Sequence, residues 1–181
     1  MITQKKIRAQ KNTIKIDDMV RQALSREIQH EGAQTKKMLE RIPLEKFNWK
    51  PHEKSREIGQ LAIHIAQTPA WTSRILAAAD FDMLTFKRDV PEIKSAADLV
   101  KISETNIQKA SEDLEKASDE HMMGMWTFRR GEHVIFSLPR VAAIRALSMN
   151  HLVHHRGQLS VYLRLLNIPV PGMYGASADE V

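Results

Sequence analysis

Cysteine is absent from the 181 residues of this chain. Disulfide bonds, thiolate metal ligands and cysteine nucleophiles are therefore excluded, and any metal ion must be held by nitrogen and oxygen atoms. Long apolar runs are also missing, since no stretch approaches the ~18 apolar residues that a membrane-spanning helix needs. The first residues lack the apolar core of a secretory signal. We therefore expect a cytoplasmic protein with no membrane partner.

Acidic residues are missing from residues 1–16, which carry Lys5, Lys6, Arg8, Lys11 and Lys15. The rest of the chain has 22 basic and 22 acidic residues, so the net charge of +5 comes from this N-terminal extension. A short basic terminus is more often solvated than bound to nucleic acid, although a nucleic-acid arm is the alternative interpretation. A neutral body offers no basic face, and we expect no nucleic-acid partner.

The remaining residues, 17–181, have the composition of one globular domain, since the chain is 43% hydrophobic and 27% charged. Apolar residues recur at helical spacing in four long segments, which predicts an all-α four-helix bundle. A short hairpin or irregular segment is expected before the last helix, around Gly131, and an irregular tail after it. The expected helices begin at Asp17 or Asp18 and end before Pro43, begin after a Ser55 cap and kink at Pro69, span Ser95 to Ala117, and span Pro139 to Asn167.

Two histidines share one face of the last predicted helix. On a wheel of about 100° per residue with Ile144 at zero, His151 lies near 340° and His155 near 20°, whereas His154 lies near 280°. An i, i+4 pair places both imidazoles about 5–6 Å apart at Cβ, within reach of a single ion. His151 and His155 are therefore the candidate ligands, and His154 is expected to flank them.

A third histidine, His64, lies on the apolar face of the second predicted helix, beside Leu61, Thr68 and Trp71. Imidazoles buried in an apolar seam need partners, and a metal ion would satisfy all three. Three ligands would leave positions open for water or substrate, as in catalytic sites. The alternative is a set of core histidines satisfied by hydrogen bonds. A zincin-type protease is disfavoured because the His151–His155 motif lacks the glutamate of such enzymes.

Other polar residues near these histidines are weaker candidates. Gln158 and Gln67 each follow a histidine by three residues, so each is a candidate for orienting a ligand, although an ordinary polar contact is the more frequent arrangement. Arg156 and Arg164 are candidates for anion binding, although arginines near a bundle end are usually solvated. No catalytic residue is assigned from the sequence.

Two segments of the chain resemble the DinB/YfiT-like metal-binding family. They cover the second and fourth helices and the C-terminus, whereas the first and third helices match in pattern only. Carried over residue by residue, the metal ligands of that family fall on His64, His151 and His155. The quoted residues are Trp49-Lys50-Pro51-His52-Glu53-Lys54-Ser55, Leu61-Ala62-Ile63-His64-Ile65-Ala66 and Trp71, then His151-Leu152-Val153-His154-His155-Arg156-Gly157-Gln158-Leu159, Tyr162-Leu163-Arg164, Pro169-Val170-Pro171 and Tyr174-Gly175-Ala176-Ser177-Ala178-Asp179-Glu180.

The resemblance implies an up-down-down-up bundle, often a homodimer, with zinc, nickel or another divalent ion in an open site. It further implies an enzyme that activates a low-molecular-weight thiol, such as bacillithiol, mycothiol or glutathione, for transfer or isomerisation. From the residues alone, activation of water is an equal expectation. The alternative is a non-catalytic metal-binding or stress-response bundle, in which the ion mainly stabilises the fold.

Overall fold

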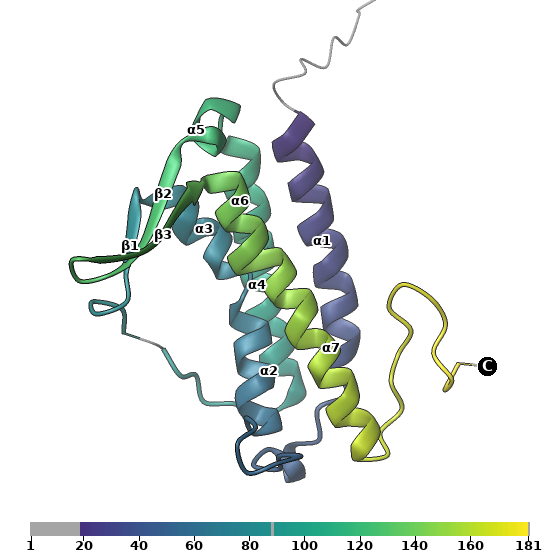
Figure 1. Ribbon diagram of the computed structural model, residues 1–181. Coiled ribbons are helices and arrows are strands. Elements are labelled where there is room, and N and C mark those ends of the chain that lie inside the picture. Colours follow the sequence, from purple (N-terminus) through teal and green to yellow (C-terminus); the bar gives the residue numbers. More distant parts are fainter. Residues whose placement is uncertain (1–18, 88, 181) are drawn as a thin grey trace, which may run out of the picture.

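The computed structural model describes residues 19–87 and 89–180, which form a mostly helical fold with a small three-stranded sheet at one end (Figure 1). The mostly helical character predicted from the sequence is confirmed, whereas the four-helix bundle and its up-down-down-up order stay predictions. No described helix is long and apolar enough to cross a membrane. The elements are α1 (Met19–Leu39), η2 (Leu44–Lys46), α2 (Ile58–Gln67), α3 (Ala70–Ala77), β1 (Asp80–Asp82), α4 (Ala96–Lys116), α5 (Asp119–Met123), β2 (Met125–Arg130), β3 (His133–Pro139), α6 (Arg140–Ile144), η3 (Arg145–Met149) and α7 (Asn150–Leu165).

Helices α1 and α4 pack along much of their length. The predicted start of α4 is confirmed by a capping box, in which the Ser95 hydroxyl accepts from the Asp98 amide and the Asp98 carboxylate accepts from the Ser95 amide. The predicted start of the first helix, at Asp17 or Asp18, lies outside the described residues. Both helices contribute apolar side chains to the core that lies beneath α2 and α7.

The start of α2 differs from the prediction, because Ser55 does not cap it. Glu57 occupies the cap position and makes no side-chain cap bond. Backbone carbonyls of the preceding loop take over this task, since the amides of Ile58 and Gly59 donate to the carbonyls of Trp49 and Phe47. The capping partners therefore come from the conformation of the preceding loop, which the residue types next to the helix start do not predict.

Pro69 separates α2 from α3, where the sequence predicted a kink within one helix. The Thr68 hydroxyl donates to the carbonyl of His64 across the last turn of α2, at 2.7 Å. Helix α3 then begins at Ala70 and carries Trp71 and Arg74. The break therefore lies one turn after His64, as the prediction placed it.

The predicted hairpin is confirmed as β2 and β3, which pair antiparallel. Gly131 makes the turn with φ of 58°, a left-handed conformation that costs glycine little. Strand β1 was not predicted from the sequence; it pairs parallel to β2 through Phe81 and its neighbours. This strand has only three residues, so it depends on a long-range partner rather than on local pattern.

The last predicted helix is a helical run from α6 through η3 to α7, and it ends at Leu165. Its first residue is Arg140, because Pro139 occupies the cap position. The middle segment, η3, is a π-helix, in which the Asn150 amide donates to the Arg145 carbonyl. Helix α7 contacts α2, and these two helices carry the three predicted ligand histidines.

Candidate metal centre

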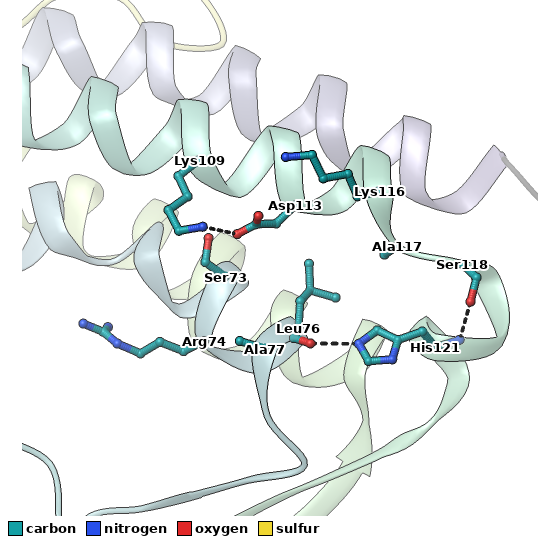
Figure 2. A pocket seen from close by; sticks show the side chains of 10 residues that line it. All are labelled: Ser73, Arg74, Leu76, Ala77, Lys109, Asp113, Lys116, Ala117, Ser118 and His121. Carbon is teal, nitrogen blue, oxygen red and sulfur yellow. Dashed lines mark hydrogen bonds and ion pairs between the residues drawn. The ribbon is translucent and has the colours of Figure 1, made fainter.

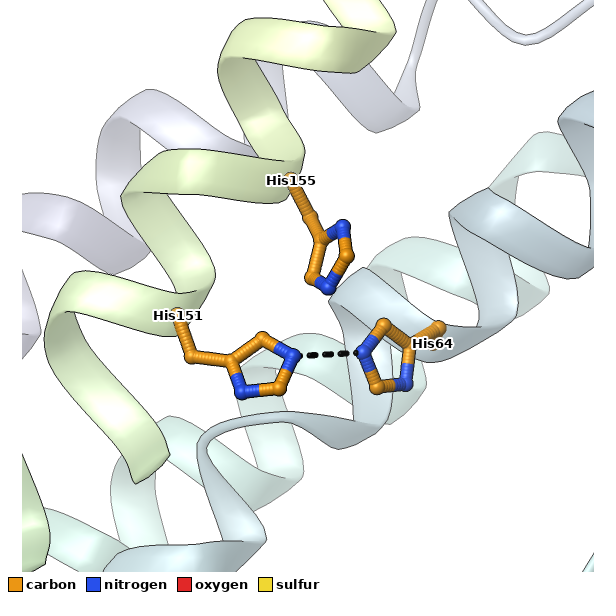
Figure 3. A group of neighbouring side chains, drawn as sticks. All are labelled: His64, His151 and His155. Carbon is orange, nitrogen blue, oxygen red and sulfur yellow. Dashed lines mark hydrogen bonds between the residues drawn. The ribbon is translucent and has the colours of Figure 1, made fainter. Parts of the chain in front are cut away.

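His64, His151 and His155 point toward one another between α2 and α7 (Figure 3). One ring nitrogen from each lies within 4.8 Å of the corresponding nitrogens of the other two. The Nε2 atoms of His64 and His151 are 3.0 Å apart, and the ring centroids of the three histidines are 4.5–5.0 Å apart. The structure therefore brings together all three residues that the sequence selected.

The placement of the pair follows from α7, and that of the third ring from α2. His151 and His155 are one helical turn apart, so their side chains leave the same face of α7. His64 lies in the last turn of α2, beside buried Leu61 and Ile65. The three imidazoles are each partly buried.

The wheel that selected the pair needs one correction. It counted from Ile144, and the π-helical segment η3 lies between that residue and the histidines. A π-helical turn holds about one residue more than an α-helical turn, so the angles across η3 shift by about 100°. The relation between His151 and His155 is unaffected, because both lie within α7.

The electrostatics of the cluster favour neutral imidazoles. Burial, together with smaller contributions from the neighbouring His155 and His154, lowers the pKa of His151 from 6.5 to about 4. Burial also lowers the pKa of His155, against a hydrogen bond between its Nδ1 and the Oε1 of Gln158, at 2.7 Å. Neutral imidazole is the form that binds metal, so His151 and His155 are in their ligand form near pH 7.

Gln158 orients His155, as the sequence suggested. Its carbonyl oxygen accepts from Nδ1 of His155, which leaves Nε2 of that ring for the centre of the cluster. Its amide nitrogen lies 3.1 Å from Nε2 of His154, an exposed residue that flanks the cluster as predicted. Gln67 has a different task, because its amide nitrogen donates to the carbonyl of Asp89.

The spacing fits a divalent ion. Two nitrogens bound to a tetrahedral ion at about 2.0–2.1 Å lie roughly 3.3 Å apart. The Nε2 atoms of His64 and His151 are 3.0 Å apart, slightly less than that value. The ligand nitrogens of all three histidines lie within 4.8 Å of one another, which is the upper limit. Small side-chain rotations therefore suffice for three-point coordination, and an all-nitrogen donor set suits zinc, nickel and similar borderline ions.

The two arginines considered for anion binding have other partners. Arg156 is 2% exposed, and its guanidinium pairs with the carboxylate of Glu31 and contacts the hydroxyl of Tyr174. Arg164 pairs with Asp179 at 2.6 Å. The anion-binding interpretation is therefore wrong for Arg156, because an internal carboxylate already occupies its guanidinium.

A sequence profile of the DinB family matches residues 10–181. The chain belongs to the DinB family. A comparison with curated protein sequences found no match.

Solved DinB-like structures share the fold of this DinB chain. A DinB-like protein from Bacillus subtilis has 20% sequence identity and a TM-score of 0.65, and the match covers 81% of this chain and 96% of that one. A DinB-like protein from Bacillus cereus ATCC 10987 has 23% sequence identity and a TM-score of 0.61, and the match covers 81% of this chain and 92% of that one. A protein described as a member of the DinB family, from Exiguobacterium sibiricum 255-15, has 20% sequence identity and a TM-score of 0.59. The match covers 90% of this chain and 97% of that one. At these identities the likeness concerns the fold.

A cavity of about 190 Å³ opens beside the histidine cluster of this DinB chain. It is lined by His64, by Trp71 and Arg74 of α3, and by Phe86 and Asp89 from the segment after β1. The sequence pattern placed Trp71 on a helix face and within the family resemblance, but it did not single out Arg74 or Phe86. Phe86 and Asp89 follow a strand that the sequence did not reveal, so no local pattern links them to His64.

A second, larger cavity of about 690 Å³ lies between α3, α4 and α5. None of the three clustered histidines lines it, and its lining includes the Lys109–Asp113 ion pair (Figure 2). His121, also in its wall, is bonded through Nε2 to the carbonyl of Leu76. The smaller cavity is therefore the one that can place a ligand next to the histidines.

Proposed function

We propose that His64, His151 and His155 hold one divalent ion, zinc or nickel, and that this DinB protein is a metal-dependent enzyme acting on a small molecule. The observation that carries the proposal is the convergence of three imidazoles, with nitrogens within 4.8 Å of one another, beside a cavity. Three ligands leave further coordination positions open, and the cavity gives those positions access to substrate.

When bound, such an ion supplies Lewis-acid chemistry, which lowers the pKa of a thiol or a water molecule and makes a nucleophile available at neutral pH. The nucleophile must come from solution if it is a thiol, because the chain has no cysteine. The residues of the chain contribute positioning: Gln158 fixes the ring of His155, and the Thr68 hydroxyl bonds the carbonyl of His64. We propose a thiol S-transferase-like reaction in the cytoplasm, with hydrolysis as the alternative.

Metal content after purification without metal-affinity resin tests the site. Wild-type protein should carry stoichiometric zinc or nickel by elemental analysis, and His155→Ala should lose it. His154→Ala is the matched control, since this neighbouring histidine is exposed and lies outside the cluster. Circular dichroism checks that both variants fold. Equal metal content in wild type and His155→Ala would contradict the assignment.

A thiol-transfer screen tests the activity separately. Turnover should require both the metal and an added low-molecular-weight thiol, and it should vanish in a folded His151→Ala variant. Turnover that needs metal but no thiol would favour hydrolysis. Stoichiometric metal without turnover on any substrate would favour the non-catalytic metal-binding alternative.

A further inference from the structure

Arg74 is a partly buried cation in the wall of the cavity that also contains His64. It lies on α3, and its guanidinium carbon is 5.4 Å from the ring centre of Trp71 and 5.0 Å from that of Phe86. Figure 2 shows the side chain extending away from the Lys109–Asp113 pair. The planar guanidinium thus lies against two aromatic rings in the wall of the cavity that His64 also lines.

Within residues 19–87 and 89–180, this guanidinium has no hydrogen bond and no ion pair. Burial lowers the pKa of Arg74, and no carboxylate offsets that effect. The two buried arginines of the described chain are satisfied, because Arg140 donates to three backbone carbonyls and Arg156 pairs with Glu31. Asp89 lines the same cavity, but it is exposed and makes no ion pair with Arg74. Arg74 therefore lacks the anion that its surroundings favour.

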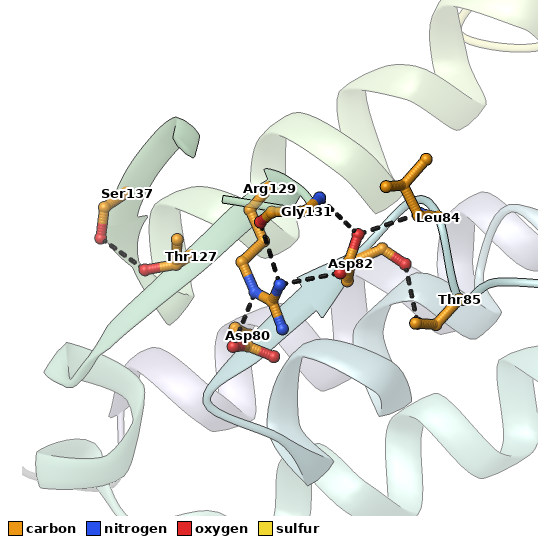
Figure 4. A network of polar contacts seen from close by, with 8 residues as sticks. All are labelled: Asp80, Asp82, Leu84, Thr85, Thr127, Arg129, Gly131 and Ser137. Atoms are coloured by element: carbon orange, nitrogen blue, oxygen red, sulfur yellow. Dashed lines mark hydrogen bonds and ion pairs between the residues drawn. The ribbon is translucent and has the colours of Figure 1, made fainter. Parts of the chain in front are cut away.

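The turn that precedes Phe86 in the chain contains a polar network around Asp82 (Figure 4). The Asp82 carboxylate accepts from the amides of Leu84 and Gly131, each at 2.9 Å, and from Arg129 at 2.7 Å. These bonds attach the turn after β1 to the β2–β3 hairpin. Phe86 follows that turn and lies 5.1 Å from Phe81, between ring centroids, so it is positioned before any ligand arrives.

We propose that Arg74 anchors the carboxylate of a small organic acid whose other end reaches the histidine cluster. The part of this proposal that concerns the histidine cluster rests on the proposed function, in which the three histidines hold a metal ion. The planar fork of arginine matches a carboxylate in two parallel hydrogen bonds. Among the described residues that line the cavity, Arg74 is the one arginine or lysine and Asp89 adds a negative charge, so these residues suit a monoanion better than a phosphate dianion. The volume of about 190 Å³ limits the ligand to a compact molecule, and Trp71 and Phe86 offer it apolar surface.

Paired probes that differ only in charge test this assignment on the full-length protein. Phenylacetate, 3-phenylpropanoate and hexanoate are each compared with the corresponding neutral amide by NMR titration. In wild-type protein at least one acid should bind roughly tenfold or more tightly than its amide, as expected for a charge-assisted hydrogen-bonded pair. Arg74→Gln should remove that preference, and Arg74→Lys should retain only part of it.

Lys109→Gln is the matched control, since it removes a cation that lines the larger cavity and is paired with Asp113. This variant should keep the wild-type preference. Absence of an acid preference for every pair, or an unchanged preference in folded Arg74→Gln, overturns the proposal. Loss of the preference in His155→Ala together with its retention in Arg74→Gln also overturns it, because the acid would then bind at the histidines.

The titrations are repeated on metal-free and zinc-loaded protein, which separates this proposal from the metal site. An Arg74-dependent preference in metal-free protein supports the anion site even if no metal binds. Stoichiometric metal together with no Arg74 dependence retains the metal site and rejects the anion site. Failure of the metal site and failure of the anion site therefore give different results in these titrations.

Discussion

Replacing Arg156 by methionine should destabilise the fold strongly, although an arginine on a helix near a bundle end is usually a solvated residue. The side chains of Arg156 and Glu31 are 3% and 10% exposed, and the guanidinium donates to the Glu31 carboxylate, the Glu31 carbonyl, the Thr35 hydroxyl and the Tyr174 hydroxyl. Methionine keeps much of the aliphatic volume but leaves the carboxylate with only the Tyr174 hydroxyl, at 2.8 Å. Removing one member of a buried pair costs about 3–5 kcal/mol.

Urea denaturation followed by circular dichroism measures this loss. With a slope of about 1–3 kcal/mol per molar urea, the midpoint should fall by roughly 1–5 M. Arg145→Met is the matched control, because Arg145 also forms an ion pair with a glutamate, Glu27, through two hydrogen bonds. In this pair the side chains are 47% and 38% exposed. That pair should contribute about 0–1 kcal/mol.

A double-mutant cycle then separates the pair from the packing. Glu31→Gln combined with Arg156→Met should cost clearly less than the sum of the two single changes, because no buried charge is left alone. Similar, small losses for Arg156→Met and Arg145→Met would refute the reasoning, since burial would then make no difference to the two pairs. Additive losses in the cycle would show that the Arg156 effect is one of packing alone.

Three further changes have defined outcomes. Gly131→Ala should lower the free energy of unfolding by about 1–2 kcal/mol, because alanine resists the φ of 58°, and Gly131→Asn should cost less in the same urea assay. Gly59→Ala should cost about 1–3 kcal/mol, since its Cβ would lie 2.3 Å from the Phe47 ring; an unchanged midpoint would contradict this packing. The His151 pKa, lowered from 6.5 to about 4, gives metal-free protein stability that is fully present above pH 6.5 and lost as the pH falls toward 4. Urea midpoints across this range should therefore decline less steeply in His151→Asn than in wild type, and parallel declines would exclude His151 as the cause.

Local features made the helices and the histidine pair predictable. Ser95, the predicted start of this helix, forms a capping box with Asp98 three residues later, which requires no other part of the chain. His151 and His155 lie within α7, so helical spacing fixes their relation. His64 was identified through the apolar face of its own helix, and its meeting with the pair needed the additional assumption that α2 packs on α7.

Long-range features were not predictable from local pattern. Strand β1 exists because Phe81 pairs with Phe128, 47 positions later in the sequence. Arg156 is buried because Glu31, on a different helix, neutralises it, whereas residue type alone favours an exposed arginine. The cavity beside His64 combines α3 with the segment after β1, so its aromatic wall and Arg74 became visible only in three dimensions.

The π-helical segment η3 also has an evolutionary consequence. Its extra residue sets the rotation of α7 relative to α6, while Ile144 keeps its place in the core before the segment. Loss of a single codon between Arg145 and Met149 would restore α-helical spacing and turn His151 and His155 together by about 100°. Such a deletion would remove the candidate metal centre while every ligand residue remained in the sequence, so descendants of this gene can keep all three histidines and lack the site.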